Sequence, residues 1–525
     1  MSNKTIVILI IAIAAICCCW LVSCCAGTLF VISRQSVEET VQDYYYNNGS
    51  DEQPILENAE PAATATPVVE TETVEETVEE TVEETVEEAV PTETATEEAI
   101  EAEAAPTEEA PVEMKAEITA DETAATKPAG ETRALSDVEE LIINTTEMTR
   151  ELSTDQKFAP VYLTTDELRE QLMNDLDAET DEEYAKETGL YRILGFVPDN
   201  FDLKQFYVDL YAEQIAGFYD TEENQMYLMS DLSDYENATT LAHEYTHFLQ
   251  YNTPKFAEGL DLDSVPDDEY GERSVIISAI TEGDATLVEA LIDTDDLLED
   301  YDEAYDDDDY ETSSSVYDSA PKYFQDNLLF PYYYGFDFVW YMYAQGGWDA
   351  VNKLYEDVPE SVEQIMHPEK YLKDHPVDIN PEPFRSAIVK DEKDIIAETV
   401  LNEADILQIF TSAYKEDWRI SDRQAAVAAE GWGGGYYIYT SNDDGELLFT
   451  KTVWDSEDDA EEAETAFKLY SDARFETAVS KSEWKDADGS SVYLIRQDDI
   501  LYWMILPEGF DSAAVLDLIN NGLAM

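Results

Sequence analysis

Two histidines stand four residues apart near the middle of the chain, and a glutamate directly follows the first of them. They are His243 and His247, with Glu244 between them. The apolar residues around this motif predict a helix, in which positions i and i+4 lie on one face, one turn apart. Two imidazoles so placed can share a metal ion, and the neighbouring carboxylate can take a proton from water. The spacing therefore predicts a zinc site with Glu244 as general base.

A third metal ligand has to come from another segment. The candidate is Glu282, which lies in a second apolar stretch with helical character. Gly283 would let this helix approach the motif helix closely. Asp284 is open to two interpretations, a carboxylate that orients a ligand or a solvated acidic residue at the start of a helix. Glu289, further along the same stretch, is expected to lie outside the metal site.

At His243, Glu244, His247 and Glu282 the sequence resembles the gluzincin branch of zinc metallopeptidases, in its membrane-anchored bacterial form. In that branch an HEXXH motif supplies two histidine ligands, and a later glutamate supplies the third. The chain lacks the third histidine of metzincins at the expected downstream spacing, which favours Glu282. The resemblance covers roughly residues 135–385 and implies a mostly helical zincin-like domain with a small sheet.

The resemblance also implies two further features of the site. Many gluzincins place a tyrosine or histidine near the metal to stabilise the oxyanion of the reaction. The candidates are Tyr332, Tyr333, Tyr334 and His367, although packing is the favoured interpretation of each tyrosine and a structural role that of His367. Upstream of the motif, Gln225–Met229 has the pattern of a short strand. Zinc peptidases of this kind use such a strand beside the cleft to pair with an extended substrate.

The expected function is that of a zinc-dependent hydrolase, a peptidase that cleaves peptide or protein substrates by Glu-assisted attack of zinc-bound water. The alternative is a non-catalytic surface protein, in which a zinc-stabilised domain presents the C-terminal module for binding. Glu244 favours the enzyme, because a purely structural site needs no base beside its ligand. A metal-dependent amidase acting on cell-wall peptides would use the same residues on a different substrate.

The N-terminal segment predicts attachment to a membrane. Residues 5–33 are almost wholly apolar, and this run exceeds the ~20 residues that span a bilayer core. Lys4 precedes the run and an acidic stretch follows Arg34, so we expect a single pass with the folded domains outside the cytoplasm. A lipoprotein signal with Cys24 as the lipid-bearing residue is the alternative. Both interpretations place the protein at the cell membrane.

Composition excludes several classes of site and partner. The formal net charge is -91, so the chain repels nucleic acid, and we expect no nucleic-acid partner. All five cysteines lie between residues 17 and 25, inside the apolar segment. The folded part therefore contains no disulfide, no cysteine-ligated zinc and no thiol nucleophile. Any metal there must be held by histidine, aspartate or glutamate.

Changes in composition divide the chain into five segments. They are the membrane segment or lipoprotein signal (1–36), a disordered acidic linker with Thr-Val-Glu-Glu repeats (37–134), the gluzincin-like domain (135–385), a helical connector (386–428) and an α+β module (429–525). The expected fold class is thus α+β. Within the linker, few aromatic residues and dense like charge leave too little apolar surface to bury. Residues 293–310 are interpreted as a solvated acidic insertion.

The C-terminal module has the pattern of a small sheet with helices. The expected elements are strands at 436–440, 447–454, 492–496 and 501–506, and helices at 458–473 and 512–520. An Asn442-Asp443-Asp444-Gly445 turn joins the first two strands. The order β-β-α-β-β-α predicts one sheet with helices packed on one face. The glycine-rich run 431–435 is a weak indication of a nucleotide site, because it does not follow a strand in a βαβ unit.

Overall fold

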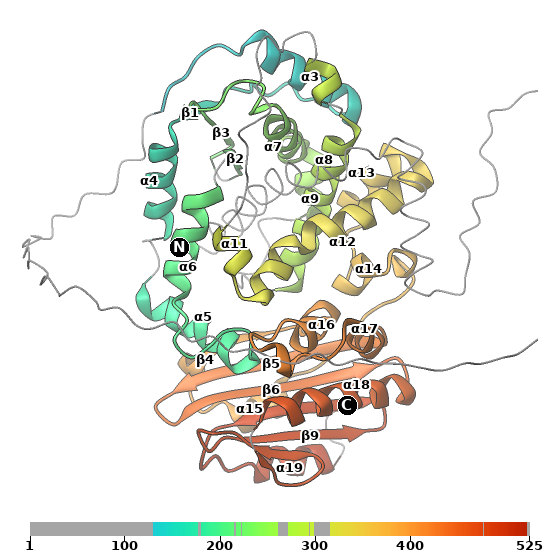
Figure 1. The fold of residues 1–525 in the computed structure, drawn as a ribbon. Helices are drawn as coiled ribbons and strands as arrows, with labels where there is room; N and C mark the ends of the chain where they lie inside the picture. The colour runs from blue at the N-terminus through green and yellow to red at the C-terminus, as the bar shows by residue number, and fades with distance from the viewer. Residues whose placement is uncertain are drawn as a thin grey trace, which may run out of the picture. The chain divides into compact units, whose positions relative to one another are not determined.

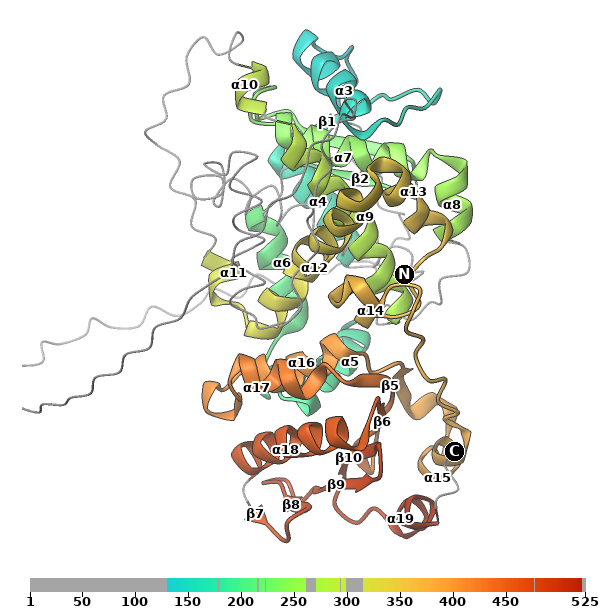
Figure 2. The ribbon, with the colours of Figure 1, turned by 90° about the vertical axis from the view of Figure 1, so that its right-hand side faces the viewer.

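The structure is a computed structural model that describes residues 130–176, 180–214, 217–221, 223–260, 271–292, 294–298, 315–475 and 477–521 (Figures 1 and 2). The expected membrane segment, the linker up to residue 129 and most of the acidic insertion lie outside the described residues. Within the described ranges, no helix is long and apolar enough to cross a membrane. The described residues all fall in one compact unit of the chain.

The region around the metal motif is mostly helical, as the sequence predicts. Its helices are α3 (Asp137–Arg150), α4 (Thr165–Leu176), α5 (Asp181–Leu194), α6 (Leu203–Gln214), α7 (Ala238–Tyr251), α8 (Pro254–Leu260), α9 (Glu272–Leu291), α10 (Thr294–Leu298), α11 (Ser315–Ser319), α12 (Lys322–Gly346), α13 (Trp348–Glu356) and α14 (Val362–Met366). The motif helix α7 is buried along nearly its whole length. It packs between α3 and α9 and beside a small sheet.

The small sheet has three strands in the order β1-β3-β2, namely β1 (Val161–Leu163), β3 (Gln225–Met229) and β2 (Gly217–Asp220). The predicted strand at 225–229 is confirmed as β3, but it lies in the middle of the sheet. It pairs in parallel with β1 and antiparallel with β2, so Tyr227 and Leu228 have partners on both sides. The expectation that this strand pairs with substrate is therefore wrong, since an occupied backbone has no free edge. Strand β2, next to β3, lies at an edge of the sheet.

Helices α9 and α12 touch through their backbones. A Cβ added at Gly283 would lie 2.2 Å from the carbonyl oxygen of Gly335. One added at Gly335 would lie 2.2 Å from the carbonyl oxygen of Ala279. The expectation that Gly283 permits a close helix contact is thus confirmed, but the partner helix is α12 rather than α7. The contact fixes the position of α9, which carries Glu282.

The C-terminal part is built on a seven-stranded antiparallel sheet in the order β4-β5-β6-β10-β9-β8-β7. The strands are β4 (Ile395–Thr399), β5 (Trp432–Asn442), β6 (Gly445–Trp454), β7 (Thr477–Ala478), β8 (Glu483–Lys485), β9 (Ser491–Gln497) and β10 (Ile500–Leu506). The helices are α15 (Glu382–Ile388), α16 (Glu403–Thr411), α17 (Asp422–Ala429), α18 (Glu457–Arg474) and α19 (Ala513–Asn520). All four predicted strands and both predicted helices are present. Strand β4 lies inside the stretch expected to be a helical connector.

Helices cover both faces of this sheet, which corrects the expectation of one covered face. Along β5 successive side chains point to opposite faces. Tyr439 belongs to the core that contains Phe467 of α18, whereas Ile438 belongs to a core with Phe384 of α15 and Val515 of α19. Figure 2 shows α18 and α19 on opposite sides of the strands. The buried, apolar character of both faces of β5 follows from this double cover.

The glycine-rich run is explained by two chain segments that cross β5. A Cβ added at Gly435 would lie 2.0 Å from the carbonyl oxygen of Leu401, and one at Gly434 would lie 2.8 Å from that of Val377. The backbone N–H of Val377 donates to the carbonyl of Gly433 at 2.7 Å. The glycines are needed because backbone approaches backbone here, which accounts for the run without a nucleotide.

The core on the α18 side of the sheet continues into helices from the metal-motif region. Tyr191 of α5 and Phe206 of α6 belong to the same buried cluster as Phe467 of α18. The end of α5 is also held by polar contacts, because Tyr470 donates to the carbonyl of Leu194 at 2.7 Å and Arg474 to that of Ile193 at 2.7 Å. The two parts of the chain are therefore joined by a common core.

Candidate metal centre

The three predicted ligands converge on one point. The Nε2 atoms of His243 and His247 lie 3.2 Å apart, and they lie 3.1 and 3.4 Å from Oε2 of Glu282. These three residues are all at most 1% exposed. Two ligands of a tetrahedral zinc ion with bonds of about 2.0–2.1 Å are separated by roughly 3.3 Å. The spacing of the three atoms therefore fits zinc.

The outer nitrogens of both imidazoles are held by acceptors. Nδ1 of His243 lies 3.2 Å from Oε2 of Glu289, and Nδ1 of His247 lies 2.9 Å from Oε1 of Gln250. The amide of Gln250 has this orientation because its Nε2 donates to the carbonyl of Thr281 at 3.0 Å. A carboxylate and an amide oxygen accept only, so both Nδ1 atoms carry hydrogen. In neutral imidazoles both Nε2 atoms would then direct a lone pair at Glu282, and a proton or a metal ion between these donors would relieve the repulsion.

The pKa shifts of the predicted ligands reflect the close contact between the carboxylate and the imidazoles. Burial alone would raise the pKa of Glu282, but the two imidazoles beside it lower that pKa to about 2. Burial opposes the charged form of His243, yet the carboxylates of Glu282 and Glu289 raise its pKa well above the usual value. A proton on His243 is therefore the competitor of a metal ion in this cluster.

Glu289 is part of the site, so the expectation that it lies outside is wrong. Its carboxylate orients His243, which is the usual arrangement of a carboxylate, an imidazole and a metal. Asp284 is fully buried, which contradicts the interpretation as a solvated residue. Its Oδ2 accepts a hydrogen bond from Gln250 at 3.2 Å, and Gln250 in turn holds His247. Asp284 thus reaches the ligand through one intermediate side chain.

Glu244 follows His243 directly, and only one of its two carboxylate oxygens is hydrogen-bonded. Its Oε2 accepts a hydrogen bond from the backbone N–H of Tyr219, in the outer strand β2, at 2.9 Å. Its Oε1 is buried and has no hydrogen-bond partner among the described residues. Burial raises the pKa of Glu244, although the two imidazoles nearby oppose that effect. A carboxylate so placed is fixed at one oxygen and can receive a proton at the other.

The four candidates for oxyanion stabilisation fall in different places. Tyr332 is buried, and its ring centroid lies 6.2 Å from that of His243. Tyr333 is 57% exposed, and Tyr334 stacks on Phe330 at 4.9 Å. His367 pairs through Nε2 with Glu403 at 2.9 Å. Of these four residues, Tyr332 is the one whose ring lies beside a predicted ligand.

The sequence-based prediction missed three contributors to the site, one of which, Glu289, it placed outside. Gln250 stands three residues after His247 in an apolar helix, and a polar residue at that spacing was an available signal. Glu289 gave the same kind of signal, because it lies two helical turns beyond Glu282. The N–H of Tyr219 gave none, since a backbone donor is placed by strand pairing and not by residue type.

A second group of carboxylates is not a metal site of the same kind. Oxygens of Glu363, Asp374 and Asp455 all lie within 4.8 Å of one another. The ammonium of Lys370 lies 2.5 Å from Glu363, 3.6 Å from Asp374 and 3.8 Å from Asp455. The ammonium of Lys370 therefore already lies among these oxygens and neutralises part of their charge.

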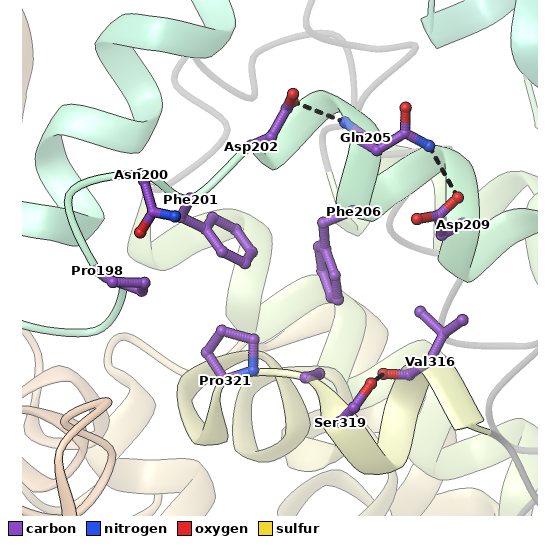
Figure 3. Close-up of a pocket in the computed structure, with 11 residues that line it drawn as sticks. Pro198, Asn200, Phe201, Asp202, Gln205, Phe206, Asp209, Val316, Ser319 and Pro321 are labelled. Carbon is purple, nitrogen blue, oxygen red and sulfur yellow. Dashed lines mark hydrogen bonds between the residues drawn. The ribbon is translucent and has the colours of Figure 1, made fainter. Parts of the chain in front are cut away.

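A surface cavity of about 390 Å³ lies between the start of α6 and the segment from α11 to α12 (Figure 3). Phe201, Phe206 and Pro321 form part of its apolar lining. Its acidic residues are already used by the helix, since Asp202 accepts from the backbone N–H of Gln205 and Asp209 from the side chain of Gln205. The lining contains none of the three predicted metal ligands and no other residue of the HEXXH motif.

Comparison with known proteins bears on the C-terminal part alone. Residues 393–515 match the model of a family described as a domain of unknown function, DUF8575. No curated protein and no solved structure matches the chain. The matched range spans the whole seven-stranded sheet and ends within α19, and it contains none of the three predicted metal ligands.

Proposed function

We propose that this protein is a zinc-dependent hydrolase, a peptidase of the gluzincin type. His243, His247 and Glu282 would hold the ion. The observation that carries the proposal is the convergence of their three donor atoms beside the buried carboxylate of Glu244. One oxygen of that carboxylate has no hydrogen-bond partner among the described residues. Zinc bound at such a site polarises a substrate carbonyl and makes water more acidic.

The residues of the chain then have distinct tasks. Glu244 is held at Oε2 by the N–H of Tyr219, so Oε1 is the atom that takes a proton from water and delivers it to the leaving amine. Tyr332, beside His243, is assigned to stabilise the negative charge that develops on the substrate oxygen.

The second candidate function is that of a non-catalytic surface protein with a structural zinc ion. The observation that favours it is the burial of the ligands, which are at most 1% exposed, since structural zinc sites are closed. The free oxygen of Glu244 favours the enzyme, because a structural site gains nothing from a buried carboxylate without a partner.

We also propose that the protein acts outside the cytoplasm at the cell membrane. The apolar run at residues 5–33, or a lipid on Cys24, would be the anchor. Peptides or proteins are the proposed substrates, and the net charge of -91 argues against nucleic acid.

One experiment tests the proposed function directly. The purified protein is analysed for metal and incubated with a mixed peptide library, in parallel with His243→Ala and Glu244→Gln. We expect about one zinc ion per chain in the wild type and in Glu244→Gln, none in His243→Ala, and peptide cleavage by the wild type alone. Zinc without cleavage would support the structural alternative, and wild type without zinc would refute both.

A further inference from the structure

A continuous set of buried polar contacts runs from helix α3 to the metal ligand His247. Arg150, the last residue of α3, donates from Nε and Nη2 to Asp284 at 2.7 and 3.1 Å. Asp284 accepts from Gln250 at 3.2 Å, and Oε1 of Gln250 faces Nδ1 of His247 at 2.9 Å. All four residues are at most 1% exposed. Figure 1 shows α3 beside α7, and α3 packs against both α7 and α9.

The orientation of each group follows from the one before it. The guanidinium of Arg150 is fixed by Asn352, which accepts from Nη2 at 2.8 Å, and by the ring of Trp348 at 4.4 Å. The ion pair with this guanidinium keeps Asp284 an acceptor. Asp284 and the carbonyl of Thr281 both accept from Nε2 of Gln250, at 3.2 and 3.0 Å, and together they leave Oε1 of this amide for His247.

The tautomer of His247 follows from this series of hydrogen bonds. Because Oε1 of Gln250 accepts, the hydrogen of the imidazole resides on Nδ1 and the lone pair on Nε2 points at Glu282. If the amide were reversed, its NH₂ group would face Nδ1 and favour hydrogen on Nε2. That tautomer cannot bind a metal through Nε2.

A role in stabilising the fold explains the presence of these buried polar residues less well than a role in positioning His247. A buried ion pair contributes little compared with apolar side chains of similar volume. The two imidazoles also differ in support, because His243 is oriented by Glu289 from α9, which already carries the ligand Glu282. His247 is instead connected to a third helix.

We propose that Gln250, Asp284 and Arg150 are positioning residues that set the tautomer and orientation of His247, so that helix α3 controls the metal affinity of a site whose ligands lie on α7 and α9. This inference rests on the proposed function for the identity of the ion, for which zinc is the probe. It assigns none of the three residues to direct contact with metal or substrate.

The test uses the full-length protein with Gln250→Met, which keeps the length of the side chain and removes both hydrogen-bonding groups. The matched control is Gln364→Met. Gln364 is equally buried and its amide bridges the N–H of Glu360 and the carbonyl of Asp374, but it contacts no metal ligand. Zinc affinity is measured by competition with a chelator. The absorption spectrum of the Co²⁺-substituted protein reports ligand geometry, and denaturant unfolding of the metal-free proteins reports the fold.

We expect Gln250→Met to bind zinc 10–100-fold more weakly and to shift the Co²⁺ bands, as is typical when a side chain that supports a metal ligand is lost. Gln364→Met should match the wild type in both measurements. Equal zinc affinity and equal spectra in the wild type and Gln250→Met would overturn the inference and leave the proposed function standing. A wild type without zinc would overturn both.

A second variant tests the far end of the connection. Asp284→Asn alone would leave Arg150 buried without a counter-charge and could prevent folding. The double variant Arg150→Met/Asp284→Asn removes both charges together. We expect it to fold and to bind zinc several-fold more weakly than the wild type. A folded double variant with unchanged zinc affinity would remove Arg150 and α3 from the inference.

Discussion

Nδ1 of His243 lies 3.2 Å from a carboxylate oxygen of Glu289, which stands two turns beyond Glu282 on the same helix. Helix α9 therefore carries one candidate metal ligand and, on the same face, the group that orients another. The carboxylate keeps the hydrogen of the imidazole on Nδ1 and makes Nε2 a better electron donor. This relationship leads to the first prediction.

Glu289→Gln should weaken zinc binding 10–100-fold, because an amide oxygen still accepts from Nδ1 but carries no charge to strengthen the ligand. Glu282→Gln should weaken binding further, since it removes a donor atom from the ion itself. The measurement is competition with a chelator at constant pH. Glu289→Gln with the affinity of the wild type would show that the contact plays no part in metal binding.

Glu244→Gln should keep the fold and the metal but lose hydrolysis. The amide oxygen can still accept from the N–H of Tyr219, whereas neither amide atom can take a proton from water. Loss of a general base typically lowers the rate 10²–10⁴-fold, or by roughly 3–5 kcal/mol of barrier. The rate is measured at saturating substrate, with zinc content determined on the same sample. A variant that contains zinc and cleaves at the rate of the wild type would contradict the assigned role.

Stability should fall as pH rises, because several carboxyl groups are buried away from the metal centre. Burial raises the pKa of Glu272 to about 8, and the pKa of both Glu363 and Asp405 to about 7. A carboxyl whose pKa is higher in the folded state than in the unfolded state stabilises the fold fully below the unfolded value. That stabilisation is lost as pH rises from about 4.5 through about 8.

Glu272→Gln tests this pH dependence. Its amide can still accept from the backbone N–H of Val362, as the carboxyl does at 2.8 Å, but it does not ionise. Denaturant unfolding at pH 5.5 and 8.5 should show a smaller loss of stability in the variant, with a difference on the order of 1–3 kcal/mol. Glu258→Gln, at an exposed position on α8, should keep the slope of the wild type. Equal slopes in all three proteins would refute the prediction.

Gly283→Ala should destabilise the fold and disturb the metal site together. The added methyl group would lie 2.2 Å from the backbone oxygen of Gly335, so α9 and α12 must separate, at a cost of about 1–3 kcal/mol. Gly346→Ala is the control at the end of α12, where the nearest atom is a side-chain carbon of Ala350 at 3.0 Å. Thermal unfolding and zinc affinity should change in the first variant and remain close to the wild type in the second. Unchanged thermal stability in Gly283→Ala would contradict the close backbone contact.

The sequence was most informative where the determining interactions are local. The helix that carries His243 and His247 follows from its apolar flanks, and the β5–β6 hairpin follows from the turn at 442–445. Strands β7 and β8 contain two and three residues, which is too short for a period-two pattern to appear. Strand β4 lies next to helical segments, and its pairing with β5 is a long-range contact.

Within the site, the convergence of the three candidate ligands was predictable and the contacts that support them were not. His243, His247 and Glu282 were identified because metal coordination needs particular residue types at particular spacings. The choice of α12 as the partner of Gly283 depends on how helices pack, which one apolar helix does not specify. The central place of β3 depends on β1, which lies some sixty residues earlier in the chain. Such arrangements are decided by tertiary contacts.

Because α5 and α6 share a core with α18, the C-terminal part depends on upstream helices to bury one of its apolar faces. The family match covers residues 393–515, but Tyr191 and Phe206 of the same buried cluster lie far upstream, and Ile519 of the other cluster lies beyond its end. A protein that carried this matched range with a different N-terminal region would expose the apolar face of α18 and its neighbours to water. It would need its own helices to cover that face. The boundary drawn by sequence similarity is therefore not the boundary of an independent folding unit.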